Sequence, residues 1–182
     1  KLILLDGGPA SGKNTLGTLI VQEFKQQDKK AILLDLDINV EEINPSWIWE
    51  NKQKEKLDQL KARENFVLKI NKYLQQDFIV IVIGERFLTK GNIANFLHRL
   101  TTTSSVYLFH LSVPFILRSQ RLDERGPHSL INLAKDQKNR DLNKKWYGYI
   151  YENINSPIID AKNIIDLIEN QKGFIDAKTF HS

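Results

Sequence analysis

The chain has 182 residues, enough for one compact domain that buries roughly two-thirds of the surface of its unfolded form, and too few for a second full domain. Its 41% of hydrophobic and 26% of charged residues exclude a disordered or membrane-spanning protein, and the absence of cysteine excludes disulfide scaffolds and thiolate metal sites. The formal net charge of +4 suits an anionic ligand but is common in lysine-rich proteins, so we do not expect a nucleic acid as partner. We expect one cytoplasmic domain over residues 1–182, as a monomer or a homodimer.

The first predicted elements are a strand, a loop and a helix. Leu2–Leu5 is a short apolar run typical of a buried parallel strand, and Gly7–Gly12 follows it as a glycine-rich loop. From Asn14 to Gln27, apolar residues recur at three- and four-residue spacing. This spacing predicts a helix with one buried face.

Further strands are predicted at Ala31–Leu36, Phe78–Ile83, Ser105–Leu111 and, as a short fifth strand, Pro157–Asp160. Helical patterns fill the gaps between them. This alternation predicts an α/β fold with three layers, in which helices cover both faces of a five-stranded parallel sheet. Ligands of such a fold bind beyond the carboxyl ends of the strands.

Two long segments do not fit this alternation. Residues 39–71 are polar and charged with scattered apolar anchors, which predicts a helical insertion over one end of the sheet. Within it, Trp47 and Trp49 either anchor the insertion to the core or stack on a flat ligand. Residues 118–145 are mostly basic and polar, and we expect them to form a lid.

The glycine-rich loop has the spacing of a phosphate-binding loop, Gly7-x4-Gly12-Lys13, between a strand and a helix. Glycines let the backbone amides point inward, and the N-terminus of the helix adds a positive dipole end. Lys13 is expected to reach the β- and γ-phosphate oxygens and to act in catalysis. The alternative is a glycine-rich turn without a ligand. The expected nucleotide-binding residues are Gly7, Gly8, Pro9, Ala10, Ser11, Gly12, Lys13, Asn14, Thr15 and, further along, Arg118.

Asn14 stands where the usual motif has the serine or threonine hydroxyl that binds Mg²⁺. Its amide oxygen is a poorer ligand, so we expect a weak metal contact and a metal held mainly by water and carboxylates. Thr15 follows one place later, as in loops that resemble those of adenylate and cytidylate kinases. Asparagine in place of the usual serine or threonine therefore disfavours a switch GTPase more than it disfavours a kinase.

Beyond the loop, the chain resembles the group of P-loop kinases that contains shikimate kinases, gluconate kinases and chloramphenicol phosphotransferases. The matching residues are Asp35-Leu-Asp37-Ile38, Arg63-Glu64-x3-Leu68, Arg118-x2-Arg121-x3-Arg125 and Asn139-Arg140. The resemblance implies a P-loop NTPase fold with strand order 2-3-1-4-5, ATP and Mg²⁺ as cofactors, and in-line transfer to a hydroxyl of a small-molecule acceptor. Gly84-Glu85-Arg86 replaces the glycine triplet of shikimate kinases, so we do not expect a shikimate kinase.

Two carboxylates near the end of the second strand are candidate catalytic groups. We expect Asp37 to orient or deprotonate the acceptor hydroxyl, and Asp35 to hold a metal-bound water. Because side chains alternate along a strand, the two would point to opposite sides of the sheet unless the strand has already ended. The alternative is that both carboxylates cap the following segment.

Arginines supply the remaining candidates. We expect Arg121 and Arg125 to grip phosphate oxygens during transfer, ahead of Arg118, because guanidinium groups are planar and permanently charged. The alternative is a solvated helix face. Glu85 and Arg86 either bind the acceptor or form a structural ion pair, and Arg63 has the same status. The expected acceptor-binding residues are Asp37, Arg63, Gly84, Glu85, Arg86 and Arg140.

Other functions remain open beside a small-molecule kinase. They are a nucleoside or nucleotide monophosphate kinase, a polynucleotide 5′-end kinase or RNA-binding NTPase, and a non-catalytic nucleotide-binding protein. An acceptor assay across nucleotides and polyols distinguishes a nucleoside or nucleotide monophosphate kinase from a small-molecule kinase. A polynucleotide kinase or RNA-binding NTPase must bind oligonucleotides with an affinity that falls steeply as the salt concentration rises. His110 lies within a predicted strand, where we expect a core residue and not a metal ligand.

Overall fold

The structure is a computed structural model that describes residues 1–45, 52–102, 104–126, 132–142 and 147–180. Within these ranges, every helix is too short or too polar for a bilayer span. The elements in chain order are β1 (Leu2–Asp6), α1 (Lys13–Gln26), β2 (Ala31–Asp35), α2 (Leu36–Ile43), α3 (Lys52–Gln75), β3 (Ile79–Ile83), α4 (Lys90–Leu97), β4 (Val106–Ser112), α5 (Phe115–Asp123), α6 (Leu133–Leu142), β5 (Tyr149–Glu152), α7 (Pro157–Glu169), β6 (Phe174–Ile175) and the 3-10 helix η2 (Ala177–Phe180).

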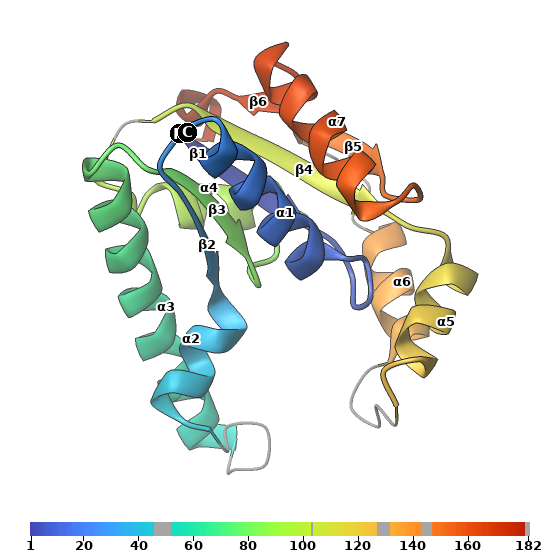
Figure 1. Ribbon diagram of the computed structural model, residues 1–182. Coiled ribbons are helices and arrows are strands. Elements are labelled where there is room, and N and C mark those ends of the chain that lie inside the picture. Colours follow the sequence, from blue (N-terminus) through green and yellow to red (C-terminus); the bar gives the residue numbers. More distant parts are fainter. Residues whose placement is uncertain (46–51, 103, 127–131, 143–146, 181–182) are drawn as a thin grey trace.

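The sheet has the strand order that the resemblance implied. The strands lie in the order β2-β3-β1-β4-β5, and each neighbouring pair is parallel (Figure 1). β1 is central, since Leu2 pairs with Val80 of β3 and with Val106 of β4. The α/β fold with a five-stranded parallel sheet is therefore confirmed. β6 adds a short antiparallel strand on the start of β4, which the sequence did not predict.

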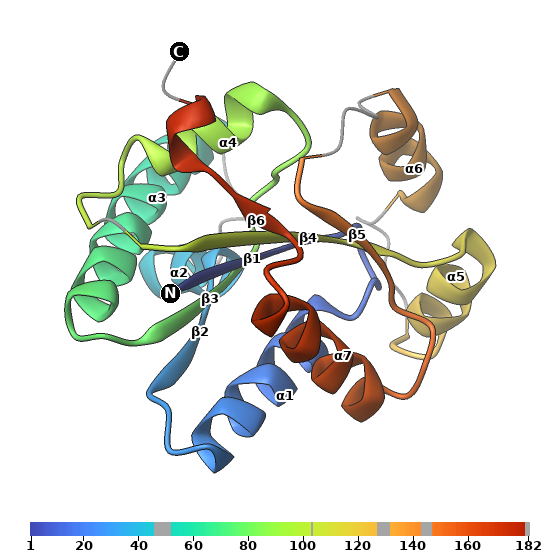
Figure 2. The same cartoon turned by 90° about the horizontal axis from the view of Figure 1, so that it is seen from above.

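Helices cover both faces of the sheet: α1 and α7 lie on one face, and α3 and α4 on the other (Figure 2). The side chains of β1 alternate between these two layers, because successive Cβ atoms of a strand point to opposite faces. Leu2 and Leu4 pack with α3 and α4, whereas Ile3 and Leu5 pack with α1 and α7. All four side chains are fully buried, so the loop after β1 starts from a strand held on both faces.

The fifth strand is not where the apolar run predicts it. Pro157–Asp160 forms the first turn of α7, and β5 is instead Tyr149–Glu152. Proline suits the first turn of a helix because its fixed φ is already helical. The apolar run then continues at helical spacing, with Ala161, Ile164 and Ile168 buried. The prediction was wrong because a run of four residues is too short to distinguish the strand period from the helical one.

The insertion and the predicted lid are mostly helical where they are described. β2 ends at Asp35 and α2 begins at once with Leu36, so the first helix starts before residue 39. α3 extends to Gln75, beyond the predicted end at residue 71. Trp47 and Trp49 lie outside the described residues. The segment predicted as a lid forms α5 and α6, and residues 127–131 and 143–146 also lie outside the described part.

The carboxyl ends of the parallel strands meet at one edge of the sheet. β1 ends there with Asp6, β2 with Asp35 and β4 with Ser112. Beyond this edge, α2 lies on one side and α5 and α6 lie on the other (Figure 1). The fold thus brings the glycine-rich loop, the insertion and the predicted lid to the same end of the molecule.

Candidate functional site

The residues between β1 and α1 form a tight loop that closes on Lys13. Gly12 caps α1 with a φ of 88°, a left-handed conformation that glycine adopts without strain. The Nζ atom of Lys13 donates to the carbonyl oxygens of Gly7 at 2.7 Å and Gly8 at 3.1 Å. The ammonium group is thus held against the loop backbone next to the N-terminus of α1. Burial lowers the pKa of Lys13, although the nearby Asp6 opposes this shift.

Asp6, the last residue of β1, ties the loop to two other elements. Its Oδ2 atom lies 3.0 Å from Nδ1 of His110 and 3.2 Å from Nη1 of Arg140. Burial alone would raise the pKa of Asp6, but the hydrogen bond with His110 and the charge of Arg140 outweigh burial and hold this pKa below its usual range. Nε2 of His110 lies 2.7 Å from the carbonyl oxygen of Tyr147. His110 is therefore a buried core residue with oxygen partners at both nitrogens, as expected.

The predicted lid contacts the loop through a second carboxylate, Asp136 of α6. Its Oδ2 atom accepts from Nη1 of Arg118 at 3.0 Å and from Nε of Arg140 at 3.2 Å. A side chain at Gly8 would have to displace the Arg118 guanidinium and the Asp136 carboxylate, which lie where its Cβ would be. The chain of ion pairs from Asp6 through Arg140 and Asp136 to Arg118 thus joins the strand before the loop to both α5 and α6.

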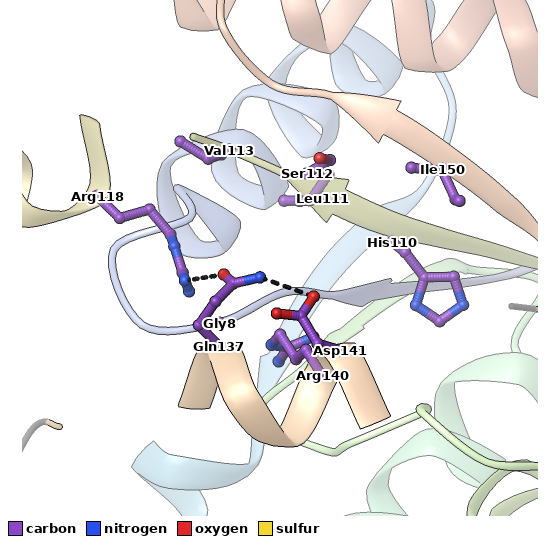
Figure 3. Close-up of a pocket in the computed structure, with 10 residues that line it drawn as sticks. All are labelled: Gly8, His110, Leu111, Ser112, Val113, Arg118, Gln137, Arg140, Asp141 and Ile150. Atoms are coloured by element: carbon purple, nitrogen blue, oxygen red, sulfur yellow. Dashed lines mark hydrogen bonds between the residues drawn. The ribbon is translucent and has the colours of Figure 1, made fainter. Parts of the chain in front are cut away.

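A cavity of about 230 Å³ lies between this network and the carboxyl end of β4 (Figure 3). Arg118, with only 3% of its side chain exposed, donates from Nη2 to Oε1 of Gln137 at 2.6 Å. Gln137 in turn donates to Oδ1 of Asp141 at 3.1 Å. Arg118, Gln137 and Asp141 therefore bind one another at this cavity, while Nε of Arg118 is buried without a hydrogen-bond partner among the described residues.

The main cleft, of about 720 Å³, opens on the other side of the loop and reaches α2 and α3. It is lined by most of the residues that the sequence predicted for the site. They are Gly7, Pro9, Ala10, Lys13, Asn14, Asp35, Asp37, Arg63, Gly84, Glu85, Arg86, Arg125 and Arg140, together with Asp6 and Asp136. A single cleft is thus lined by the phosphate loop, the carboxylates at the strand end and the insertion.

The two candidate carboxylates lie on the same side because β2 ends before Asp37. Asp35 caps α2, its Oδ1 accepting from the backbone N–H of Asp37 at 2.9 Å. Its Oδ2 accepts from Nδ2 of Asn14, also at 2.9 Å, which ties the loop to the cap. Burial, with the charge of Asp35 next in weight, raises the pKa of Asp37. Asp35 therefore caps the following helix, which was one of the two possibilities for these carboxylates, while Asp37 lines the cleft.

The side-chain oxygen atoms of Asp35 and Asn14 suit a Mg²⁺ ion that they contact mainly through water molecules. Mg²⁺ in phosphotransferases keeps several waters and takes one or two carboxylates plus phosphate oxygens. The described residues contain no group of three or more histidine, cysteine or acidic side chains that could enclose a metal ion. Asp35 and Asn14, beside the loop, therefore fit a metal held mainly by water and by a bound polyphosphate.

The far wall of the cleft contains an ion pair between α3 and the loop that follows β3. Nε of Arg63 donates to Oε1 of Glu85 at 3.0 Å. Glu85 follows Gly84, whose φ of 89° lets the chain turn directly above the start of α2. Of the two roles expected for Glu85, the structure contains the ion pair, and Arg86 beside it is exposed.

A small cavity of about 130 Å³ lies beside the N-terminus of α1 and contains Gly12, Thr15, Arg121 and Arg125. The loop after β5 forms its other wall. Asn153, the first residue of that loop, donates from Nδ2 to the carbonyl oxygen of Ser11 at 2.7 Å.

A fully buried carboxylate fixes the loop after β5. Asp160 accepts from the Tyr151 hydroxyl at 2.6 Å, and from the backbone and side chain of Asn155 at 3.1 Å and 2.8 Å. Burial and the bond to Asp160 raise the pKa of Tyr151 to about 12. Asn155, which lines the small cavity, is therefore held in place by Asp160, which does not line it.

Five predicted nucleotide-binding residues lie outside the lining of the main cleft. Gly12 and Thr15 line the small cavity, as does the predicted catalytic Arg121. Gly8 and Arg118 line the cavity of about 230 Å³, and Ser11 is buried in the loop. The roles of all the predicted site residues stay predictions. Sequence reasoning missed Asp6, Asp136 and Asn153. Asp6 could have been found from its place at a strand end before Gly7, whereas the other two depend on contacts between distant segments.

Several solved structures match the fold. A shikimate kinase from Acinetobacter baumannii, in complex with shikimate, has 21% identity and a TM-score of 0.64, with 94% of each chain covered. The APS kinase of Mycobacterium tuberculosis, in complex with AMPPNP and APS, has 15% identity and a TM-score of 0.63, over 93% of this chain and 97% of that one. An unliganded sugar kinase from Janibacter has 14% identity and a TM-score of 0.64, over 93% and 94%.

Sequence comparison adds one partial match. The model of a family described as chromatin associated protein KTI12 matches residues 1–87, which include the phosphate loop, β2 and β3. No curated protein matches the chain. Strand order, loop position and these structural matches agree, and the chain therefore has the fold of the P-loop kinases.

Proposed function

We propose that the protein is an ATP-dependent phosphotransferase that moves the γ-phosphoryl group to a hydroxyl of a small-molecule acceptor. One observation carries the proposal: Lys13 of the phosphate loop and Asp37 of α2 line a single cleft of about 720 Å³. A cleft of that size accommodates a triphosphate end and a small acceptor side by side. The matching kinases support a small-molecule acceptor, since two of them are in complex with shikimate or APS.

The loop is suited to the polyphosphate of ATP. Backbone amides after Gly7 and the N-terminus of α1 favour negative charge, and Lys13 adds a cation at the same place. The APS kinase that matches over most of the chain is in complex with AMPPNP, an ATP analogue, which supports ATP as the donor. The cavity beside Thr15, which Arg121 and Asn153 also line, adjoins the loop, and we expect the rest of the nucleotide to bind there.

Mg²⁺, when bound with ATP, neutralises charge on the phosphates. In this chain Asp35 would hold it through water and Asn14 would add a weak contact, since both line the cleft beside the loop. Arg125 and Arg140 add fixed positive charge at the same end. The protein's own contribution is therefore positioning and charge neutralisation.

Transfer needs one proton acceptor, and Asp37 is suited to that role. The acceptor oxygen forms a bond to the γ-phosphorus while the bond to the β,γ-bridging oxygen breaks and ADP leaves with its electron pair. The hydroxyl proton passes to the Asp37 carboxylate. A pKa raised by burial and by neighbouring carboxylates makes Asp37 a better proton acceptor than an ordinary aspartate.

The test combines nucleotide binding and transfer. Lys13→Ala is expected to weaken AMPPNP binding by about tenfold or more in calorimetry, because it removes the cation of the loop. Lys25→Ala, at an exposed position of the same helix, is the matched control and should bind as the unmodified protein does. Asp37→Asn should keep AMPPNP binding and lose transfer of radiolabelled phosphate to an acceptor panel. Unchanged binding and turnover in Lys13→Ala would refute the proposal.

A second candidate is a nucleotide-binding protein that transfers no phosphoryl group. Asn14 favours it, because an amide replaces the metal-binding hydroxyl and its Nδ2 is engaged with Asp35. The match of residues 1–87 to a chromatin associated family is in line with a binding role. This candidate predicts slow ATP turnover that no acceptor in the panel accelerates.

A further inference from the structure

One carboxylate in the main cleft holds two arginines at once. Asp136 of α6 lines this cleft together with Lys13, and its side chain is only 13% exposed. Its Oδ2 atom accepts from Nη1 of Arg118 at 3.0 Å and from Nε of Arg140 at 3.2 Å. A phosphate oxygen accepts from guanidinium groups in the same way, so Asp136 occupies contacts that a phosphate group could use.

Arg140 is the arginine of the two that lines the main cleft. Its Nε donates to Asp136 and its Nη1 donates to Asp6 at 3.2 Å, so two sides of the guanidinium group are turned to carboxylates. The side chain of Arg140 is 12% exposed, and both carboxylates are likewise shielded from water. The charge of Arg140 is therefore already neutralised next to the phosphate loop.

The pairing with Asp136 leaves Arg118 with incomplete hydrogen bonds. Nη1 and Nη2 of Arg118 donate to Asp136 and Gln137, but Nε is buried and donates to no atom of the described residues. A buried donor without an acceptor raises the free energy of the folded state. Asp136 thus holds Arg118 in a place that does not satisfy the whole guanidinium group.

Asp136 also lies against the phosphate loop. Its carboxylate lies next to Gly8, where a Cβ would be. The loop amides, the N-terminus of α1 and Lys13 favour negative charge at the loop. A polyphosphate bound there would repel the carboxylate of Asp136 and attract the guanidinium group of Arg140. Because Arg118 would remain its partner, Asp136 would not be left unpaired if Arg140 turned to the polyphosphate.

We infer that Asp136 is an autoinhibitory residue, whose carboxylate competes with the polyphosphate of the nucleotide for Arg140. This inference rests on the proposed function and concerns the regulation of the same site. When a polyphosphate occupies the loop, Arg140 exchanges its contact with Asp136 for a contact with a phosphate oxygen. Asp136 therefore keeps the affinity of the protein for nucleotides below the affinity that the loop and Arg140 would give without it.

The test measures the affinity of the full chain for AMPPNP with Mg²⁺ by calorimetry. Asp136→Asn keeps the shape of the side chain and removes its charge, so AMPPNP should bind about tenfold more tightly. Asp136→Glu keeps the charge and should bind AMPPNP no more tightly than the unmodified protein does. Asp141→Asn is the matched control, because it removes the same charge from the same helix outside the lining of the main cleft. Its affinity should change by less than about twofold, since the charge is exposed and screened by salt.

A purely structural role of Asp136 predicts the opposite sign. Asp136→Asn would then loosen the contact of α6 with the loop, and AMPPNP would bind more weakly. That result would overturn the inference. An equal gain in Asp136→Asn and Asp141→Asn would also overturn it, because the gain would then reflect net charge alone, and so would a gain of the same size in Asp136→Glu.

NMR of the unmodified protein tests the same exchange without a substitution, and it decides if Asp136→Asn does not fold. The Nε–H resonance of Arg140 is followed while AMPPNP and Mg²⁺ are added. This resonance should move as the loop fills, because Nε leaves the carboxylate of Asp136. A resonance that keeps its position when the loop is saturated would refute the competition for Arg140.

The same titrations distinguish the two levels of failure. If the unmodified protein binds AMPPNP and Asp136→Asn binds it no more tightly, the autoinhibitory role is refuted while the proposed function stands. If neither protein binds AMPPNP, the proposed function fails and the inference about Asp136 fails with it.

Discussion

Gly84 offers a direct test of how the insertion is joined to the sheet. Its φ is 89°, and a Cβ built there would lie 2.8 Å from the backbone nitrogen of Leu36 and 2.9 Å from Oδ1 of Asp35. The same Asp35 oxygen caps α2. Gly84→Ala therefore introduces both a disfavoured backbone conformation and an overlap with the start of the helix that presents Asp37.

The expected cost is the sum of these two effects. A left-handed conformation costs an alanine roughly 1–2 kcal/mol, and forcing an extra carbon against packed backbone costs about 1–3 kcal/mol. We expect Gly84→Ala to lower the free energy of unfolding by about 3 kcal/mol, which corresponds to roughly 6–12 °C in Tm for a protein of this size.

Urea unfolding with two other glycine variants isolates the contributions. At Gly126, φ is 95° and no atom of the described residues lies within 4 Å of the added Cβ, so Gly126→Ala measures the conformational cost alone. At Gly91, in α4, the nearest such atom is 3.9 Å away, so alanine should stabilise the helix by about 0.5–1 kcal/mol. If Gly84→Ala destabilises the protein no more than Gly126→Ala, the close approach to α2 is refuted.

Two further substitutions test the anchors of the phosphate loop. Because folding lowers the pKa of Asp6, its carboxylate stabilises the fold above the ordinary value of 3.8, and this contribution is lost as the pH falls through the lowered pKa. Asp6→Asn should therefore cost about 1–3 kcal/mol near neutral pH, because His110 loses its carboxylate and Arg140 keeps only Asp136, and it should cost less at about pH 3. Urea unfolding at both pH values checks this, and an equal cost at both contradicts it. Asn153→Ala leaves the Ser11 carbonyl without its hydrogen-bond donor, so it should lower the free energy of unfolding by about 1–3 kcal/mol in the same assay and weaken AMPPNP binding. An unchanged urea midpoint would show that this hydrogen bond does not stabilise the loop.

The elements that the sequence predicted correctly are those whose signal is local. The apolar run of β1, the glycine spacing that follows it and the periodicity of α1 each occupy a short window, and burial of all four apolar residues of Leu2–Leu5 agrees with that interpretation. The run at Pro157–Asp160 misled because four residues fit both periods, and the helix becomes evident only with Ile164 and Ile168 included.

The contacts that hold the site together have no such local signal. Asp6 meets Arg140 across 134 residues of chain, and Arg63 meets Glu85 across 22. From the sequence, Glu85 could form an ion pair or contact the acceptor. The sequence does not distinguish the two, because the outcome depends on how α3 packs beside β3. The sequence also could not show that Arg118 pairs with Asp136, which lies on a helix further along the chain.

The central position of β1 has a consequence for synthesis of the protein. β1 needs β4 as a neighbour, and its Asp6 pairs with His110, 104 residues later in the chain. A ribosome adds roughly 5–20 residues per second, so one edge of β1 waits about 5–20 s for this partner with its backbone hydrogen-bonding groups unpaired. Until then the nascent chain has an exposed strand edge, which favours aggregation. Weakening β4 should therefore reduce the yield of folded protein more than it reduces the activity of the molecules that do fold.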